Sequence, residues 1–102
     1  MSIGFARVAA VSVRVHLGDV QANEREILAA MERLRARNVR VALFPELCLT
    51  GYTLGDLLLH ELTRRQALGS LENLAKRTGD MAVIVGLPVS ADGRLFNCAA
   101  VL

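Results

Sequence analysis

The sequence predicts a layered α/β protein, and three observations lead to this fold class. The chain has 102 residues, which is enough for one small domain. It is 53% hydrophobic but only 4% aromatic, a composition that suits strands of Val, Ala and Leu buried on both faces. Short apolar runs alternate with longer segments of helical periodicity, which is the pattern of strands connected by helices.

The first half of the chain predicts a strand, a helix and a second strand. Residues 5–13 form the first apolar run. Asp19 and Asn23 are both candidate N-caps of the helix that follows, because both side chains can accept a hydrogen bond from a free backbone N–H. Asn23 also has Glu26 three positions later, as in a capping box. The buried stripe of this helix is expected at i, i+3, i+4 and i+7, on Ile27, Ala30, Met31 and Leu34. Asn38 is expected to end the helix in a left-handed conformation, before a strand over residues 39–44.

A second helical region follows. Residues 54–60 predict a short helical segment, and residues 61–78 predict an amphipathic helix that Gly79 ends. The expected buried stripe of this helix is Leu68, Leu71, Leu74 and Ala75. His16 and His60 have no neighbours at the spacing of metal ligands, so we interpret His16 as a loop histidine and His60 as a helix-surface or half-buried residue.

The last quarter of the chain predicts a hairpin. Residues 81–85 form an uninterrupted apolar strand that ends in Gly86-Leu87-Pro88. Asp92-Gly93 is a strong signal for a tight turn between two strands, and residues 94–102 form the second strand of the pair. The expected order is therefore strand, helix, strand, helix, strand, hairpin, strand.

Glu46 is the candidate catalytic residue. It follows the apolar run directly after Pro45, which ends a sheet ladder because it has no N–H to donate. Three apolar residues come next, so we expect the carboxylate to lie in mostly apolar surroundings. Burial raises the pKa of a carboxyl group, as a general base working near neutral pH requires. A structural ion pair at the end of a strand is the alternative interpretation.

The segment FPELCLTGY, residues 44–52, resembles the signature of the nitrilase, or carbon–nitrogen hydrolase, superfamily. Its longer form, FPELCLTGYTLGDL, is most similar to the N-terminal glutaminase domain of glutamine-dependent NAD synthetases. The strings VIVGLP and LFNCAAV resemble the third and fourth strands of the same superfamily. This resemblance implies the N-terminal portion of a nitrilase-type α-β-β-α sandwich. Residues 1–102 would then be the first part of a single domain, incomplete at its C-terminal end, and Asp19 would be the helix start.

The resemblance also implies a mechanism. Glu46 would be the general base of a Glu-Lys-Cys triad whose Lys and Cys come from later segments, so the 102 residues alone are expected to be inactive. The complete enzyme would hydrolyse glutamine and supply ammonia for ATP-dependent NAD synthesis. Tyr52 is expected near the substrate pocket. No cofactor is expected in this segment, since ATP and Mg are implied only for a separate synthetase domain. The expected partners are glutamine, the rest of the polypeptide and, for the full length, further copies of the protein.

Two other functions stay open. The first is a stand-alone amidase or carbamoylase of the same superfamily, and the second is a truncated piece that only packs or assembles. The TLGDL continuation favours the synthetase over the stand-alone amidase, whereas the chain length favours the truncated piece. We interpret Cys48 and Cys98 as packing residues rather than nucleophiles. Lys76 lies on the expected wet face of its helix and does not match the triad lysine.

Charge and composition argue against other classes. The net charge is +2, and a cluster of arginines spans one helix end, at Arg33, Arg35, Arg37 and Arg40. Without a denser patch and stacking aromatics, we interpret this cluster as a solvated helix face rather than a nucleic-acid site. No apolar stretch approaches the length of a membrane span, and two cysteines make no disulfide framework. We therefore expect a cytoplasmic protein without a nucleic-acid or membrane partner.

Overall fold

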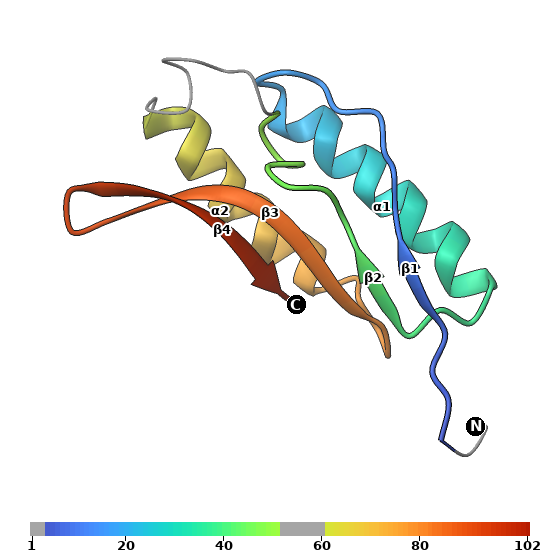
Figure 1. Ribbon diagram of the computed structural model, residues 1–102. Coiled ribbons are helices and arrows are strands. Elements are labelled where there is room, and N and C mark those ends of the chain that lie inside the picture. Colours follow the sequence, from blue (N-terminus) through green and yellow to red (C-terminus); the bar gives the residue numbers. More distant parts are fainter. Residues whose placement is uncertain (1–3, 52–60) are drawn as a thin grey trace.

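The computed structural model describes residues 4–51 and 61–102, and in these ranges two helices cover one face of a four-stranded sheet (Figure 1). The elements in chain order are β1 (Val8–Ala10), α1 (Val20–Ala36), β2 (Val41–Leu43), α2 (Glu61–Ala75), β3 (Ala82–Ala91) and β4 (Arg94–Val101). The strands lie side by side in the order β1-β2-β3-β4. The first three are parallel and β4 is antiparallel to β3, which confirms the mixed α/β fold class.

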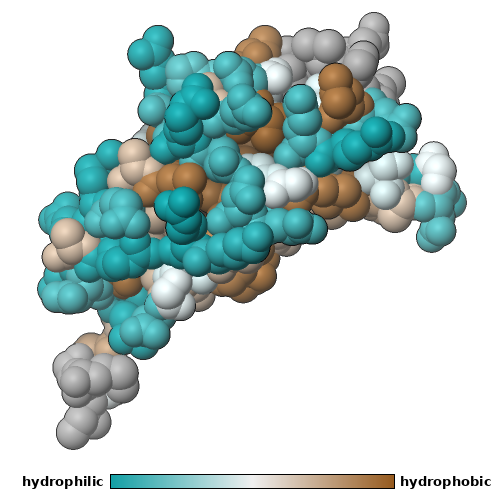
Figure 2. Space-filling view, turned by 180° about the vertical axis from the view of Figure 1, so that it is seen from behind, coloured by the Kyte–Doolittle hydropathy of each residue, from teal (hydrophilic) through white to brown (hydrophobic). Residues whose placement is uncertain are grey.

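The hydrophobic core lies between the sheet and the two helices. Ile27 and Met31 of α1 and Leu74 of α2 pack there with Val83 and Val85 of β3, and all five are at most 1% exposed. Each such side chain contributes about 1.5–3 kcal/mol when it is fully buried. Hydrophilic residues cover most of the helical side of the molecule, as Figure 2 shows. The helices therefore divide their surfaces between the core and solvent, as amphipathic helices do.

The opposite face of the sheet presents apolar side chains to solvent. Val8 of β1 is 66% exposed, Leu43 of β2 is 49% exposed and Val101 of β4 is 72% exposed. The register places Val8 opposite Val41 and Leu43 opposite Ile84, so these residues belong to one face. This face, which we call the open sheet face, lies on the side away from the helices (Figure 1).

Helix α1 begins where the resemblance favoured. Asp19 is its N-cap, and the Asp19 side chain accepts a hydrogen bond of 3.0 Å from the backbone N–H of Ala22. Asn23 lies one turn inside the helix and is buried, so it is not the cap. Asn38 follows the helix with φ of 59°, the left-handed conformation expected for a residue that ends a helix.

The first two strands are shorter than the sequence predicts. Strand β1 covers three residues rather than residues 5–13, and β2 covers three rather than residues 39–44. Pro45 is the physical reason at their carboxyl ends, since the chain turns away from the ladder there and leaves β1 without a partner. The last bond between the two segments runs from the N–H of Val11 to the carbonyl of Leu43, at 2.8 Å.

Helix α2 ends at Ala75 rather than Thr78, and only part of its expected stripe is buried: Leu74 lies in the core and Leu71 packs half-buried against it. Ala67, Ser70 and Leu74 are buried, whereas Leu68 is 46% exposed and Ala75 is also exposed. The Ser70 hydroxyl donates a 2.7 Å hydrogen bond to Glu24 of α1, so this polar residue is satisfied at the helix–helix contact. The prediction was wrong for Leu68 and Ala75, because it ranked positions by hydrophobicity and missed the small residues Ala67 and Ser70.

Strand β3 continues through Gly86 and Pro88 to Ala91, although the sequence predicts an end near Val85. In an antiparallel ladder, pairs that exchange both backbone hydrogen bonds alternate with pairs that exchange none. Val83 and Leu102 are a bonded pair, so Pro88 and Asn97 fall on a pair that exchanges none, and Pro88 need not donate to β4. Strand β2 has already ended beside it, and a proline there removes no ladder bond.

The predicted hairpin is confirmed. Asp92 and Gly93 have φ of 52° and 72°, and they connect the pair Ala91 and Arg94 as a two-residue turn. Gly79 has a left-handed φ of 57°, but α2 has already ended at Ala75, so Gly79 lies in the turn before β3 and does not cap the helix as predicted. The short helical segment predicted at residues 54–60 lies outside the described residues. Neither described helix has the length and apolar character needed to cross a bilayer.

Candidate functional site

Glu46 stands in a tight turn at the carboxyl end of β2. The N–H of Cys48 donates to the carbonyl of Pro45 at 3.2 Å, and the N–H of Thr50 donates to the carbonyl of Leu47 at 3.2 Å. Leu47 has φ of 51°, a left-handed conformation that is unusual for a residue with a branched side chain. Because β1, β2 and β3 are parallel, their carboxyl ends lie on the same side of the sheet, and α/β proteins bind ligands there. The Glu46 turn lies on that side.

The turn rests against the backbone of β3 at Gly86. The N–H of Leu49 donates to the carbonyl of Gly86 at 3.2 Å. A Cβ atom added to Gly86 would lie 2.4 Å from the backbone nitrogen of Leu47 and 3.0 Å from the backbone of Glu46. A glycine is therefore required here for close approach rather than for its φ angle.

The structure corrects the expectation that Glu46 is buried among apolar side chains. Leu47, Cys48 and Leu49 are 5%, 1% and 0% exposed, because the turn directs them into the core. The same turn directs the side chain of Glu46 to the open sheet face, where it is exposed. Residues 4–51 and 61–102 therefore do not bury the carboxylate of Glu46 as the sequence predicted.

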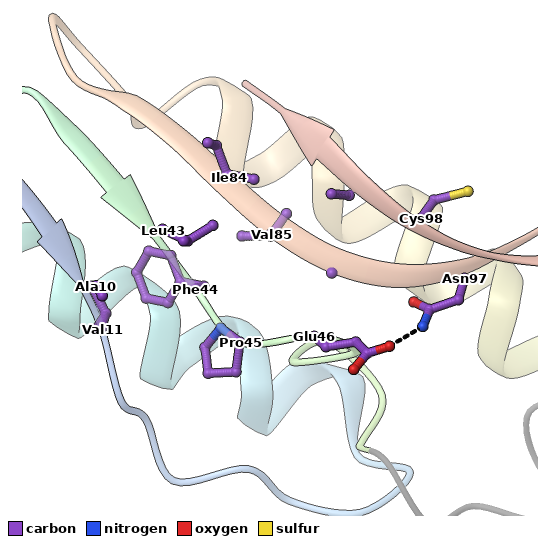
Figure 3. Close-up of a pocket in the computed structure, with 12 residues that line it drawn as sticks. Ala10, Val11, Leu43, Phe44, Pro45, Glu46, Ile84, Val85, Asn97 and Cys98 are labelled. Atoms are coloured by element: carbon purple, nitrogen blue, oxygen red, sulfur yellow. Dashed lines mark hydrogen bonds between the residues drawn. The ribbon is translucent and has the colours of Figure 1, made fainter.

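Asn97 is the hydrogen-bond partner of this carboxylate. Its side-chain amide nitrogen, Nδ2, donates to Oε1 of Glu46 from strand β4, across the sheet edge (Figure 3). The two residues are 51 positions apart, and no spacing rule connects them. Asn97 was not predicted as a site residue. The sequence signal that could have found it is a single polar residue within an apolar strand.

A pocket of about 500 Å³ opens beside this pair on the open sheet face. Apolar side chains and backbone form most of its wall, with Glu46 and Asn97 as polar groups at one end (Figure 3). Its lining comes from all four strands and the turn: Ala10, Val11, Leu43, Phe44, Pro45, Glu46, Ile84, Val85, Gly86, Asn97, Cys98 and Ala99. An apolar hollow with few convergent polar groups is typical of small-molecule sites.

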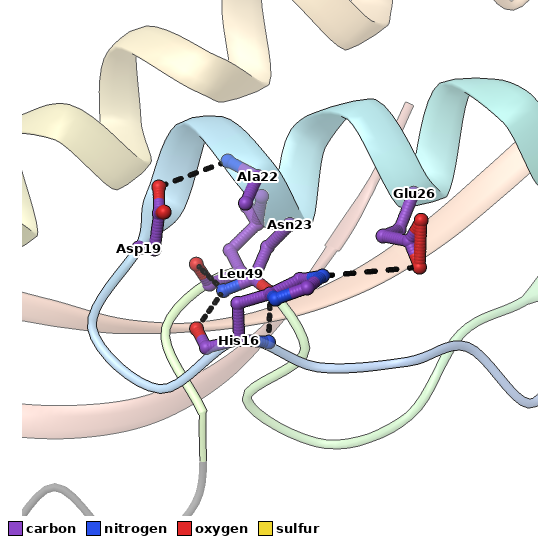
Figure 4. A network of polar contacts seen from close by, with 6 residues as sticks. All are labelled: His16, Asp19, Ala22, Asn23, Glu26 and Leu49. Atoms are coloured by element: carbon purple, nitrogen blue, oxygen red, sulfur yellow. Dashed lines mark hydrogen bonds and ion pairs between the residues drawn. The ribbon is translucent and has the colours of Figure 1, made fainter.

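A buried hydrogen-bond network anchors the Glu46 turn to α1 (Figure 4). The amide of Asn23 donates to the carbonyls of His16 at 2.8 Å and Leu49 at 2.9 Å, and it accepts from the N–H of His16 at 2.6 Å. Asn23 is 1% exposed; its bond to Leu49 is fully buried, and its two bonds with His16 are partly buried. His16 is the loop residue that was predicted, with its ring 3.9 Å from the carboxylate of Glu26.

The two cysteines lie in different environments. Cys48 is buried, and loss of hydration on burial raises the pKa of its thiol despite a 3.9 Å contact with the carbonyl of Gly86. A raised pKa disfavours the thiolate at neutral pH, which agrees with a packing role for Cys48. Cys98 is half-buried in β4 rather than buried. Among residues 4–51 and 61–102, no three His, Cys, Asp or Glu side chains gather as a metal site would need.

Lys76 follows α2 on the exposed side, as predicted. The structure does not bring it into the pocket beside Glu46. Tyr52 and His60 lie outside the described residues, so their predicted places are not compared with the structure.

Relatives of known sequence match nearly the whole chain. The glutamine-dependent NAD(+) synthetase of Mycobacterium leprae is 30% identical over 103 residues, which cover 99% of this chain and 15% of that protein. The protein of the same name from Xylella fastidiosa is 34% identical over 99 residues, which cover 96% of this chain and 18% of that protein. The chain thus spans less than a fifth of the length of these relatives.

Solved structures show the same fold. The glutamine-dependent NAD(+) synthetase from Cytophaga hutchinsonii superposes with a TM-score of 0.91 at 31% identity, over 95% of this chain and 17% of that chain. An amidase from Nesterenkonia sp. superposes with a TM-score of 0.80 at 22% identity, over 94% of this chain and 37% of that chain, and shows the fold alone. Residues 7–102 match the family described as Carbon-nitrogen hydrolase. The predicted resemblance is confirmed, and the chain belongs to the carbon–nitrogen hydrolase family.

Proposed function

We propose that this segment supplies the general base of an amide hydrolase, and that Glu46 is that base. One observation supports the assignment most directly. The carboxylate of Glu46 stands beside an apolar pocket at the carboxyl ends of the parallel strands, with one oxygen held by Asn97. A base needs this combination of a fixed carboxylate and adjacent space for the group whose proton it removes.

The chemistry follows from these groups and from the family's triad. Glu46 takes the proton of a Cys thiol that a later segment supplies, and the sulfur attacks the carbon of a side-chain amide. A Lys and backbone N–H groups stabilise the negative oxygen of the tetrahedral intermediate. The C–N bond then breaks, the amine nitrogen takes a proton and leaves as ammonia, and a thioester remains. Water activated by Glu46 hydrolyses the thioester and restores the thiol.

The relatives support glutamine as the amide. Those that match nearly the whole chain at 30–34% identity are named glutamine-dependent NAD(+) synthetases. We therefore propose that this chain is the first part of a glutaminase domain whose ammonia serves ATP-dependent NAD synthesis in the same polypeptide. The proposal includes Tyr52 as a residue of the substrate pocket, and a cytoplasmic, homo-oligomeric complete protein.

The test compares two rates in the complete polypeptide. Glu46→Gln keeps the shape of the side chain but removes the base, so glutamine-fed synthesis of NAD should fall by about 100- to 10,000-fold. Synthesis fed by ammonium should continue, because it needs no hydrolytic step. Glu32→Gln is the matched control, since Glu32 is an exposed carboxylate on α1 that pairs with Arg35 and does not line the pocket.

Each rival function predicts a different result. A stand-alone amidase would lose its single activity in Glu46→Gln and would show no ATP-dependent reaction with ammonium. If Glu46 is purely structural, both rates should fall together and the melting temperature should drop. Equal loss of both rates in a destabilised variant would therefore overturn the catalytic assignment.

A further inference from the structure

We propose that Asn97 is the positioning residue for Glu46, which orients the carboxylate so that one chosen oxygen faces the reacting proton. The proposal rests on the amide hydrolysis proposed above. It starts from the contact between the two side chains, in which Nδ2 of Asn97 donates to Oε1 of Glu46. The other oxygen, Oε2, has no hydrogen-bond partner among residues 4–51 and 61–102. One oxygen is thus anchored and the other is available to accept a proton.

The orientation is needed because Glu46 is exposed. A glutamate side chain has several rotatable bonds and is not confined by packing at an exposed position. Leu47 and Pro45 fix the backbone on either side of Glu46, but they do not fix its carboxylate. The amide of Asn97 is the described group that does so, as Figure 3 shows.

The chemical type of Asn97 suits a base. A neutral amide donates a hydrogen bond without carrying a charge. A Lys or Arg at this position would form an ion pair and reduce the basicity of the carboxylate strongly, whereas an Asp would repel it. Asparagine therefore holds the oxygen and leaves the carboxylate able to remove a proton.

The β3–β4 hairpin sets both halves of this arrangement. The two-residue turn at Asp92 and Gly93 places Asn97 opposite Pro88, and a register slip of one residue would turn its side chain to the helical face. Two positions along β3, Gly86 contacts the backbone of Glu46. One hairpin thus positions the backbone and the carboxylate of the same residue.

The experiment uses three variants of the complete polypeptide. Asn97→Ala removes the donor, Asn97→Gln keeps an amide, and Asn73→Ala is the matched control. Asn73 donates a 3.1 Å hydrogen bond to the carboxylate of Glu24 on the helical side, so its variant loses the same kind of bond at a distant place. Ammonia release from glutamine is measured against glutamine concentration, which separates kcat from KM.

We expect kcat of Asn97→Ala to fall by about 10- to 100-fold, the range that loss of a hydrogen bond to a charged group allows. KM should change less than about twofold, since the amide does not bind substrate in this role. Asn97→Gln should recover part of kcat, and Asn73→Ala should match the wild type. Wild-type kcat in Asn97→Ala would overturn the proposal.

A second measurement needs no activity. The side-chain amide signal of Asn97, recorded by NMR against pH, should move as Glu46 takes up a proton, and this movement should vanish in Glu46→Gln. If the amide signal of Asn97 moves with pH in the same way in the wild type and in Glu46→Gln, the positioning role is overturned, whatever the rates of ammonia release are. If the signal follows Glu46 but the wild type releases no ammonia, the proposed function fails instead, and the positioning role fails with it.

Discussion

Replacing Gly86 by Ala tests how closely β3 must approach the Glu46 turn. The added Cβ would lie 2.4 Å from the backbone nitrogen of Leu47, while ordinary contacts begin at 3.4 Å, so the turn must move by about 1 Å. The contacted atoms belong to the backbone and cannot rotate away as a side chain can. We expect a loss of about 1–3 kcal/mol of stability, as for other overpacked sites. A displacement of 1 Å at a catalytic group also lowers the rate about 100-fold.

Thermal unfolding and ammonia release from glutamine measure the two effects in the complete protein. Gly69→Ala is the matched control, because it makes the same chemical change in α2 where no atom lies within 4 Å of the added Cβ. Alanine favours a helix over glycine by about 0.5–1 kcal/mol, so this control should be as stable as the wild type or more so. A Gly86→Ala protein with wild-type melting temperature and rate would refute the close approach.

Two further predictions concern buried residues. Asn23→Ala should cost about 3 kcal/mol in unfolding measurements, because the carbonyls of His16 and Leu49 lose their donor inside the protein; a loss below about 0.5 kcal/mol would contradict the network. Cys48 should react with a thiol reagent more slowly than Cys98 at neutral pH. As the pH is raised, the labelling rate of Cys48 should keep increasing at pH values where an ordinary thiol is already ionised, since burial raises the pKa of Cys48. Faster labelling of Cys48 than of Cys98 would refute this.

Local conformations could be predicted because local chemistry decides them. Asp19 caps α1 with its own side chain, Asn38 tolerates the left-handed region, and Asp92-Gly93 favours a two-residue hairpin turn in almost any context. Asn23 shows the limit of such rules. Its position relative to Glu26 satisfies a capping pattern, yet its three hydrogen bonds connect segments that are distant in sequence.

The lengths of strands and the buried face of α2 required the tertiary structure. Strand β3 continues through Pro88 because β2 ends beside it, and no local property of Pro88 reports where another strand ends. Ser70 can be buried because Glu24 of α1 accepts a hydrogen bond from its hydroxyl, whereas Leu68 remains exposed despite its hydrophobicity. Partners that are distant in sequence override propensity in both cases.

The sequence by itself determined the family, the layered α/β class and the identity of Glu46 as the candidate base, because a strand, a proline and a turn at fixed spacing form a local pattern. Only the tertiary structure decided that Glu46 faces an open pocket rather than the core, that Asn97 holds its carboxylate and that Gly86 contacts its backbone. The physical reason is that all three features depend on the register between β3 and β4 and on the packing of this hairpin against the end of β2. These contacts join residues about 40 and 50 positions apart in the sequence.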